Sequence, residues 1–275
     1  MGTAILQGLL TRVKPEDQTE IKCTACVRSK ESLSRLQKIF ENENRVEPNS
    51  GHFVEAANNA DVVFLGVPPT ELGALLDEPG LIGALQNKVV ISLLAGISCE
   101  RVATALKVDS GDGAGKQETC HILRVIPSIG AKANDSVSLI ADTTFAGEDG
   151  KQICRWLFEQ LGTAMFLAET LMDDATAAGA ACHALTIVAT DAIVDTCVAE
   201  GMPRAAAMQL AASSLRSSAG LLATSMTPES LKEAMSVPSG ITINALLQLD
   251  RANTRAAISD ATRHAIHYTR KMASS

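Results

Sequence analysis

Residues 20–168 alternate between nearly unbroken apolar runs and helical patterns, and this alternation restricts the fold more than any other feature. Runs such as ADVVFLGV at 60–67 and KVVISLLAG at 88–96 contain few polar residues. Strands of this composition are buried on both faces, as in a parallel sheet covered by helices. We therefore predict an α/β fold with a Rossmann-like doubly wound parallel sheet. The predicted strands are 20–27, 60–67, 88–96, 120–127, 135–142 and 164–168, and the predicted helices are 30–40, 71–79, 81–87, 99–106 and 150–162.

The sequence begins with a helical pattern, over residues 2–12, and no strand comes before it. In dinucleotide-binding folds the first strand leads into a Gly-rich turn, G-x-G-x-x-G/A, that opens the first helix. Gly2 has the position of the third glycine of such a turn. The expectation is therefore a sheet whose first strand, with the first two glycines, is missing from the sequence.

The pattern changes after residue 170, where long Ala-rich helical stretches replace the alternation. They cover 171–201, 202–225, 228–236 and 254–273, with no strand signal among them. We predict a dinucleotide-binding domain over 1–168 and a helical substrate-binding and dimerisation domain over 169–275. The apolar surface of these helices is large for their length, which favours a homodimer or higher homo-oligomer.

The net charge of −7 argues against nucleic acid as a partner, because phosphate binding needs clustered Lys and Arg. No signal peptide and no stretch of about 20 apolar residues is evident, so neither export nor a membrane span is predicted. Residues 108–119, which are rich in Gly and polar residues, are interpreted as an exposed surface insert.

Seven cysteines at irregular spacings indicate reduced thiols and a cytoplasmic protein. Cys23 and Cys26 form a C-x-x-C pattern, but in a strand their side chains point to opposite faces, which disfavours a redox or metal role. His264 and His267 lack an evident third ligand. No metal site is predicted.

Seven segments make the chain resemble the pyrroline-5-carboxylate reductase family over nearly its whole length. The most specific is AMSVPSGITINALLQLD at 234–250, which is similar to the family's Ser-Pro-Gly-Gly-Thr-Thr-Ile signature. The others are MGTAILQGLL (1–10), ADVVFLGVPP (60–69), VVISLLAGIS (89–98), LRVIPSIGA (123–131), DDATAAGA (173–180) and EGMPRAAAMQLA (200–211).

The resemblance implies NADPH-dependent reduction of the cyclic imine 1-pyrroline-5-carboxylate to L-proline in proline biosynthesis, with NADH as a possible cofactor. Thr242 is the expected catalytic side chain, a hydrogen-bond donor near the imine nitrogen. His183 could donate a proton to that nitrogen, or be a helix histidine at an interface. The turn could instead be a plain connection between helices. The implied substrate-binding residues are Pro238, Ser239, Gly240, Ile241, Thr242 and His183.

The resemblance also implies a cofactor site. Arg28, Ser29 and Lys30 follow a strand, where a basic and hydroxyl pair would hold the 2′-phosphate of NADPH. Their alternative interpretation is a solvated helix start with Ser29 as its cap. The implied cofactor-binding residues are Gly2, Arg28, Ser29, Lys30, Val67, Pro68, Pro69, Ala95 and Gly96.

Several positions depart from the family pattern. Pro68, Ser128, Val237 and Ser239 replace a Lys, an Asn, a Ser and a Gly, and 180–182 reads Ala-Ala-Cys in place of Ser-Gly-Pro. These departures leave two alternatives open. One is a reductase of another cyclic imine, such as a piperideine carboxylate in a specialised biosynthetic pathway. The other is a catalytically inactive, truncated relative that acts as a dimeric binding protein.

Overall fold

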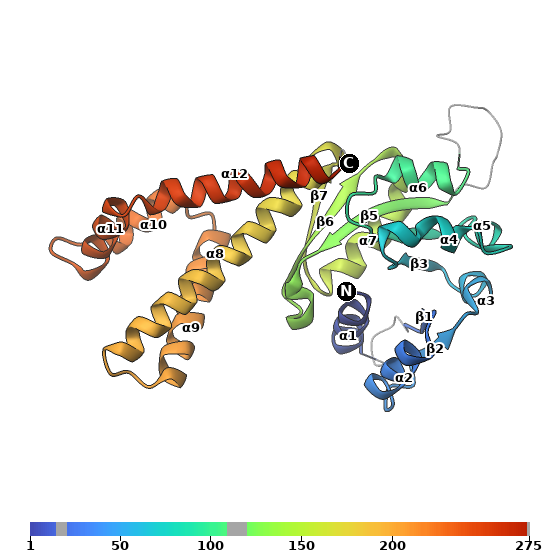
Figure 1. Ribbon diagram of the computed structural model, residues 1–275, viewed down its shortest axis with the longest axis horizontal. Helices are drawn as coiled ribbons and strands as arrows, with labels where there is room; N and C mark the ends of the chain where they lie inside the picture. Colours follow the sequence, from blue (N-terminus) through green and yellow to red (C-terminus); the bar gives the residue numbers. More distant parts are fainter. Residues whose placement is uncertain (15–20, 109–119, 274–275) are drawn as a thin grey trace. The chain divides into compact units, whose positions relative to one another are not determined.

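The computed structural model describes residues 1–14, 21–108 and 120–273 of the chain (Figure 1). The chain divides into two compact units, 1–176 and 177–275. The proposed insert lies outside the described residues from position 109 onward.

The first unit contains two sheets. The larger has the strand order β3-β4-β5-β6-β7, and the smaller pairs β1 with β2 in parallel. The strands are β1 (Cys23–Val27), β2 (Val46–Ser50), β3 (Val62–Leu65), β4 (Val89–Ser92), β5 (His121–Pro127), β6 (Ser136–Asp142) and β7 (Gly162–Ala168). Strand β2 was not predicted, because its sequence VEPNS lacks an apolar run. It is a strand because its backbone pairs with β1 in register, Cys23 opposite Val46.

The larger sheet is of the predicted parallel type, with one antiparallel pair of strands. Strands β3, β4 and β5 are parallel, but β6 runs antiparallel to β5, with Val125 opposite Ile140. The physical reason is the short connection over 128–135, which holds only the 3-10 turn η2 (Ile129–Ala133). A parallel neighbour would need a crossover of a dozen or more residues.

Helices cover both faces of the larger sheet, as a doubly wound fold requires. Val90 and Ile122 pack in one cluster with α4 (Leu72–Leu76), α5 (Leu81–Ala84) and α6 (Cys99–Ala105). Ile91 and Leu123, on the opposite face, pack with α1 (Gly2–Arg12) and α7 (Gly147–Glu159). Successive residues of a strand therefore point into two different cores, and this explains the unbroken apolar runs.

Among the described residues, four strands lie at a sheet edge: β1 and β2 pair only with each other, β3 pairs only with β4, and β7 pairs only with β6.

Helix α1 packs against both sheets. Ile5 and Leu9 belong to the core of the larger sheet, whereas Leu10 packs with Leu36 and Phe40 beside the smaller sheet. Both contacts come from the predicted apolar stripe of the helix.

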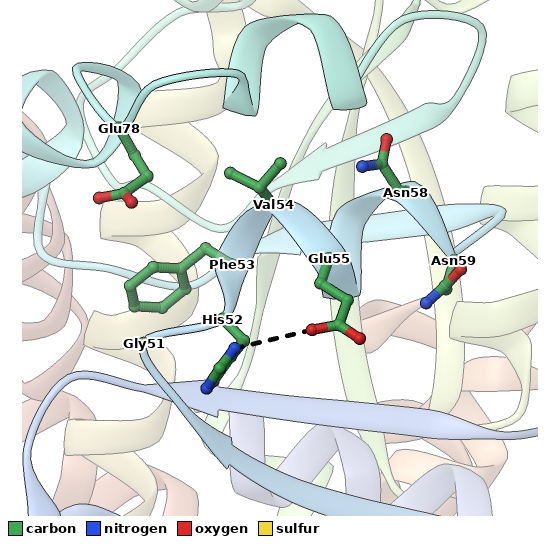
Figure 2. Close-up of a pocket in the computed structure, with 8 residues that line it drawn as sticks. All are labelled: Gly51, His52, Phe53, Val54, Glu55, Asn58, Asn59 and Glu78. Carbon is green, nitrogen blue, oxygen red and sulfur yellow. Dashed lines mark ion pairs between the residues drawn. The ribbon is translucent and has the colours of Figure 1, made fainter.

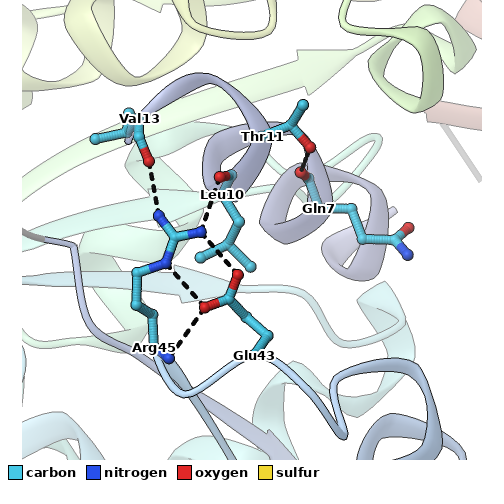
Figure 3. Close-up of polar contacts among 6 residues, drawn as sticks. All are labelled: Gln7, Leu10, Thr11, Val13, Glu43 and Arg45. Atoms are coloured by element: carbon cyan, nitrogen blue, oxygen red, sulfur yellow. Dashed lines mark hydrogen bonds and ion pairs between the residues drawn. The ribbon is translucent and has the colours of Figure 1, made fainter. Parts of the chain in front are cut away.

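Arg45 closes the carboxyl end of α1 (Figure 3). Its guanidinium donates to the carbonyl oxygens of Val13 at 2.7 Å and Leu10 at 2.9 Å, and it pairs with Glu43 Oε2 at 2.7 Å. These carbonyls lie at a helix end, where partners within the helix are lacking. The hydrogen bond from Arg45 lowers the pKa of the Glu43 carboxyl. One side chain thus ties the strand β2 region to α1.

The remaining elements of the first unit are short. Pro79 and Gly80, the latter with φ +90°, separate α4 from α5, which lie within the two helices predicted at 71–79 and 81–87. Helix α7 ends at Glu159 rather than at Gly162, which has φ +140° and opens β7. The others are α2 (Lys30–Ile39), α3 (Phe53–Asn58), η1 (Pro69–Glu71), η3 (Thr144–Ala146) and η4 (Glu169–Leu171).

The second unit is helical throughout its described part, as predicted. Its buried core is small and contains Val194, Ala207 and Ala211. Large apolar side chains remain outside, among them Ile187 at 68% and Val188 at 69% exposure. The helices are α8 (Met172–Ala199), which begins in the first unit, α9 (Arg204–Ala223), α10 (Pro228–Met235), α11 (Ile241–Arg251) and α12 (Thr254–Ala273).

One helical stretch, 169–199, is long and apolar enough to cross a membrane by length and composition alone, and 17% of its most apolar window is buried. Asp173, Asp174, Asp191 and Asp195 interrupt this stretch, so it contains no run of about 20 apolar residues. An exposed apolar helix is expected where a partner chain covers it.

Replacing Arg45 with Met should destabilise the fold, because two helix-end carbonyls and Glu43 lose their donor. We expect a loss of about 1–3 kcal/mol in the free energy of unfolding, measured by urea denaturation. Hydrogen exchange should quicken in the last turn of α1. Arg35→Met on the exposed face of α2 is the control and should change little. Equal effects of the two substitutions would contradict the role of Arg45.

Three buried thiols should be inert in the folded chain. Burial raises the pKa of Cys99 and Cys154 to about 12 and that of Cys120 to about 11. Since the thiolate is the nucleophile, iodoacetamide at pH 8 should leave all three unmodified, as read by peptide mass spectrometry. The control is the chain unfolded in guanidinium, where all seven cysteines react. Labelling of Cys154 at the unfolded rate would refute the assignment.

Candidate functional site

The expected cofactor residues of the first unit follow the carboxyl ends of parallel strands. Arg28 follows β1, Val67–Pro69 follow β3, and Ala95 and Gly96 follow β4. In open α/β sheets this edge is where ligands bind. Gly2 is the exposed first residue of α1, whose start carries no side-chain cap.

The turn after β1 holds a charged and a capping residue side by side. Ser29 is the N-cap of α2, and its Oγ accepts a hydrogen bond from the Ser32 backbone N–H at 3.1 Å. It also donates to Ser32 Oγ at 2.9 Å. The capping interpretation of Ser29 therefore describes its present contacts. Lys30 is exposed on the first turn of the same helix.

Arg28 forms an ion pair that the sequence did not reveal. Its Nη1 lies 2.6 Å from Oε2 of Glu71, the last residue of η1. The pair brings the turn after β1 together with the segment after β3. Both side chains are about half exposed, at 48% and 43%.

An open pocket of about 610 Å³ lies at the carboxyl end of β2, around the start of α3 (Figure 2). Two hydrogen bonds join its rim to the turn after β1: Gly51 N–H donates to the Val27 carbonyl, and Ser50 Oγ donates to the Arg28 carbonyl at 3.4 Å. The sequence had not indicated this pocket, since β2 itself was missed. Its lining is Gly51, His52, Phe53, Val54, Glu55, Asn58, Asn59 and Glu78.

The loops after β3 and β4 form the other part of this edge. Pro68 and Pro69 are exposed, and Val67 is half-buried. Gly96 has φ +74°, which is a conformation that suits glycine, in the turn between β4 and α6. Leu94 is buried beside this turn and fixes it to the core.

A buried arginine holds the end of the loop after β4 in place through an acidic residue. Arg124 on β5 is 2% exposed and lies 2.5 Å from Asp173 and 3.6 Å from Glu169. Glu169 Oε1 also accepts from the Cys99 backbone N–H at 3.0 Å, at the start of α6. The Asp173 carboxylate, in the first turn of α8, thus pairs with a side chain of the sheet. A charged residue within the apolar run HILRVIP was the available signal.

The expected substrate residues of the second unit lie together in one turn at the start of α11. Gly240 is the N-cap, and its N–H donates to the Val237 carbonyl at 2.9 Å. Ser239 has the left-handed conformation, with φ +59°. Ile241 is 92% exposed, and Thr242 follows it in the first helical turn.

That helix start presents backbone N–H groups without a side-chain cap. Such a terminus suits a carboxylate, because the unpaired donors and the helix dipole both favour negative charge. His183 is exposed on α8, a different helix. The turn and the cofactor edge lie in different compact units.

The comparisons with known proteins cover both units. The family model described as NADP oxidoreductase coenzyme F420-dependent matches residues 1–96, and the one described as pyrroline-5-carboxylate reductase dimerisation matches 169–272. A delta-1-pyrroline-5-carboxylate reductase of Curvularia clavata is 30% identical over 284 residues, covering 100% of this chain and 88% of the relative. A pyrroline-5-carboxylate reductase of Lophium arboricola is 29% identical, covering 96% and 88%.

Solved structures agree on the fold. A pyrroline-5-carboxylate reductase from Coxiella burnetii has a TM-score of 0.80 at 20% identity, covering 98% of this chain and 94% of that one. The pyrroline carboxylate reductase of Plasmodium falciparum, solved with NADP bound, has a TM-score of 0.69 at 19% identity, covering 94% and 100%. A Rossmann-like domain joined to a helical domain of this kind defines an oxidoreductase that acts on carbon–nitrogen double bonds. The chain belongs to the pyrroline-5-carboxylate reductase family, which confirms the resemblance noted in its sequence.

The two residues at the centre of the turn should respond oppositely to substitution. Ser239→Gly should raise the melting temperature slightly, because it relieves about 1 kcal/mol of left-handed strain, partly offset by backbone entropy. Gly240→Ala should lower it, since a Cβ there would lie 2.9 Å from the Val237 carbonyl oxygen. Calorimetry on both variants checks the pair. A stabilised Gly240→Ala variant would contradict this turn geometry.

Proposed function

We propose that this chain catalyses the NADPH-dependent reduction of 1-pyrroline-5-carboxylate to L-proline, as a cytoplasmic homodimer that associates through its helical domain. Residues 1–168 bind the cofactor in this proposal, and 169–275 bind the imino acid and form the dimer. The observation that carries it is the turn over 237–242. It keeps an uncapped helix start and a hydroxyl side by side in a chain of this family.

The residues after β1 and β4 fit a nicotinamide dinucleotide. A half-exposed guanidinium, an ammonium group and a helix start lie at one strand end, and this donor set suits phosphate. Arg28 and Lys30 would hold the 2′-phosphate, with the start of α1 at Gly2 toward the pyrophosphate. When bound, the reduced nicotinamide supplies a hydride to the imine carbon.

The turn of α11 has two tasks in this proposal. The N–H groups of Ile241 and its neighbours hold the substrate carboxylate, because they are donors at a positive helix end. The Thr242 hydroxyl donates a hydrogen bond to the imine nitrogen, which polarises the carbon–nitrogen bond. Pro68 and Pro69, with Val67 and the Ala95–Gly96 turn, wall the nicotinamide side and limit access of water. His183 is a second candidate proton donor.

A second candidate function is the reduction of a six-membered imine such as a piperideine carboxylate. The observation that favours it is Ser239 in the left-handed conformation, which places a side chain where the family signature has only hydrogen. Val237, 59% exposed beside it, also departs from the signature. A third possibility is an inactive dimeric binding protein that keeps the same fold.

The test is an assay of NADPH oxidation by the purified chain with each imine, with NADH as the second cofactor. Thr242→Ala should lower kcat about a hundredfold, because a donor to the reacting nitrogen is lost. Thr242→Ser keeps the hydroxyl and is the matched control, which should retain most of the activity.

The same assay separates the three functions. Activity confined to the six-membered imine would replace the proline assignment. NADPH binding without turnover of either imine would favour the inactive relative.

A further inference from the structure

We propose that Glu71 sets the discrimination between NADPH and NADH by occupying the guanidinium that would otherwise bind the 2′-phosphate. This inference rests on the proposed cofactor site and adds to it a specificity-determining residue. Glu71 is absent from the expected site residues and lies 43 positions from its partner in sequence.

The position of Glu71 is fixed by its own backbone. Its N–H donates to the Pro68 carbonyl at 2.8 Å, within the η1 turn that Pro69 begins. Proline limits the backbone freedom of this turn. The Arg28 backbone is also held, since its carbonyl accepts a hydrogen bond from Ser50 Oγ. The two side chains therefore meet from backbones that are each anchored, with Nη1 and Oε2 2.6 Å apart.

The pair remains open to exchange. Both side chains are about half exposed, so a ligand can reach the guanidinium, and an exposed ion pair is weak enough to be displaced. A phosphate group carries more charge than a carboxylate and offers the same two-oxygen geometry to an arginine. The 2′-phosphate would therefore compete with the Glu71 carboxylate for the guanidinium.

The displaced carboxylate still affects binding. Glu71 would remain close to a dianionic 2′-phosphate and repel it, whereas a ribose 2′-hydroxyl can donate a hydrogen bond to an acid in this place. The Ser29 hydroxyl already caps α2. Arg28 and Lys30 are therefore the side chains of this turn that would attract the phosphate. Glu71 therefore weakens the binding of NADPH. The binding of NADH is unchanged or strengthened.

The test compares two fragments, adenosine 2′,5′-bisphosphate and AMP, by calorimetric titration of the full chain at low salt. Glu71→Gln should tighten binding of the bisphosphate about threefold or more, the size expected for one exposed charge pair. AMP affinity should stay the same or fall. Asp77→Asn, which removes one exposed charge a few residues later in the chain, is the matched control and should change neither affinity.

A double-mutant cycle ties the effect to the guanidinium. Arg28→Gln should weaken bisphosphate binding, and adding Glu71→Gln to that variant should give a smaller gain, because only the direct repulsion is then relieved. An unchanged bisphosphate affinity in Glu71→Gln, or a gain of the same size without Arg28, overturns this inference alone. If the unsubstituted chain binds neither fragment nor NADPH, the proposed cofactor site itself fails.

Discussion

The first unit depends on one buried charge. Arg124 interrupts the apolar run of β5, and its guanidinium is held by Asp173 and Glu169, which begin the long helix of the chain. A charge removed from water is tolerated only when it is paired. The pairing therefore fixes where the carboxyl end of β7 must turn into α8. The sheet and the start of α8 cannot vary independently of each other.

Glu169, one of the two acids that hold Arg124, also contacts the loop after β4. Glu169 accepts the hydrogen bond of the Cys99 backbone N–H, which begins α6 directly after the Ala95–Gly96 turn. Burial, with the nearby Glu169 carboxylate, raises the pKa of the Cys99 thiol to about 12, so this position carries no negative charge beside the acids. The loop proposed to line the nicotinamide and the start of α8 thus share one carboxylate. A change at Glu169 would move both.

Local sequence patterns predicted the elements that depend mainly on their own residues. Runs buried on both faces became strands, and Ser29 became a helix cap as its alternative interpretation stated. Strand β2 was missed because VEPNS is a strand through its pairing with β1 and not through its composition. The ion pair between Arg28 and Glu71 was missed for a related reason: it joins two ordinary surface charges through the fold, and neither residue carries a signal alone.

The turn before α11 shows which family positions are fixed by geometry. The family signature has two adjacent glycines, and this chain keeps only the second. At position 239 the turn has a left-handed backbone, which costs a residue with a side chain about 1–2 kcal/mol but leaves the turn intact. At Gly240 a Cβ would meet the Val237 carbonyl at 2.9 Å, so the turn itself would have to open. Loss of the first glycine therefore strains the backbone, whereas loss of the second produces a steric clash. The retained glycine is the one without which the backbone could not form this turn.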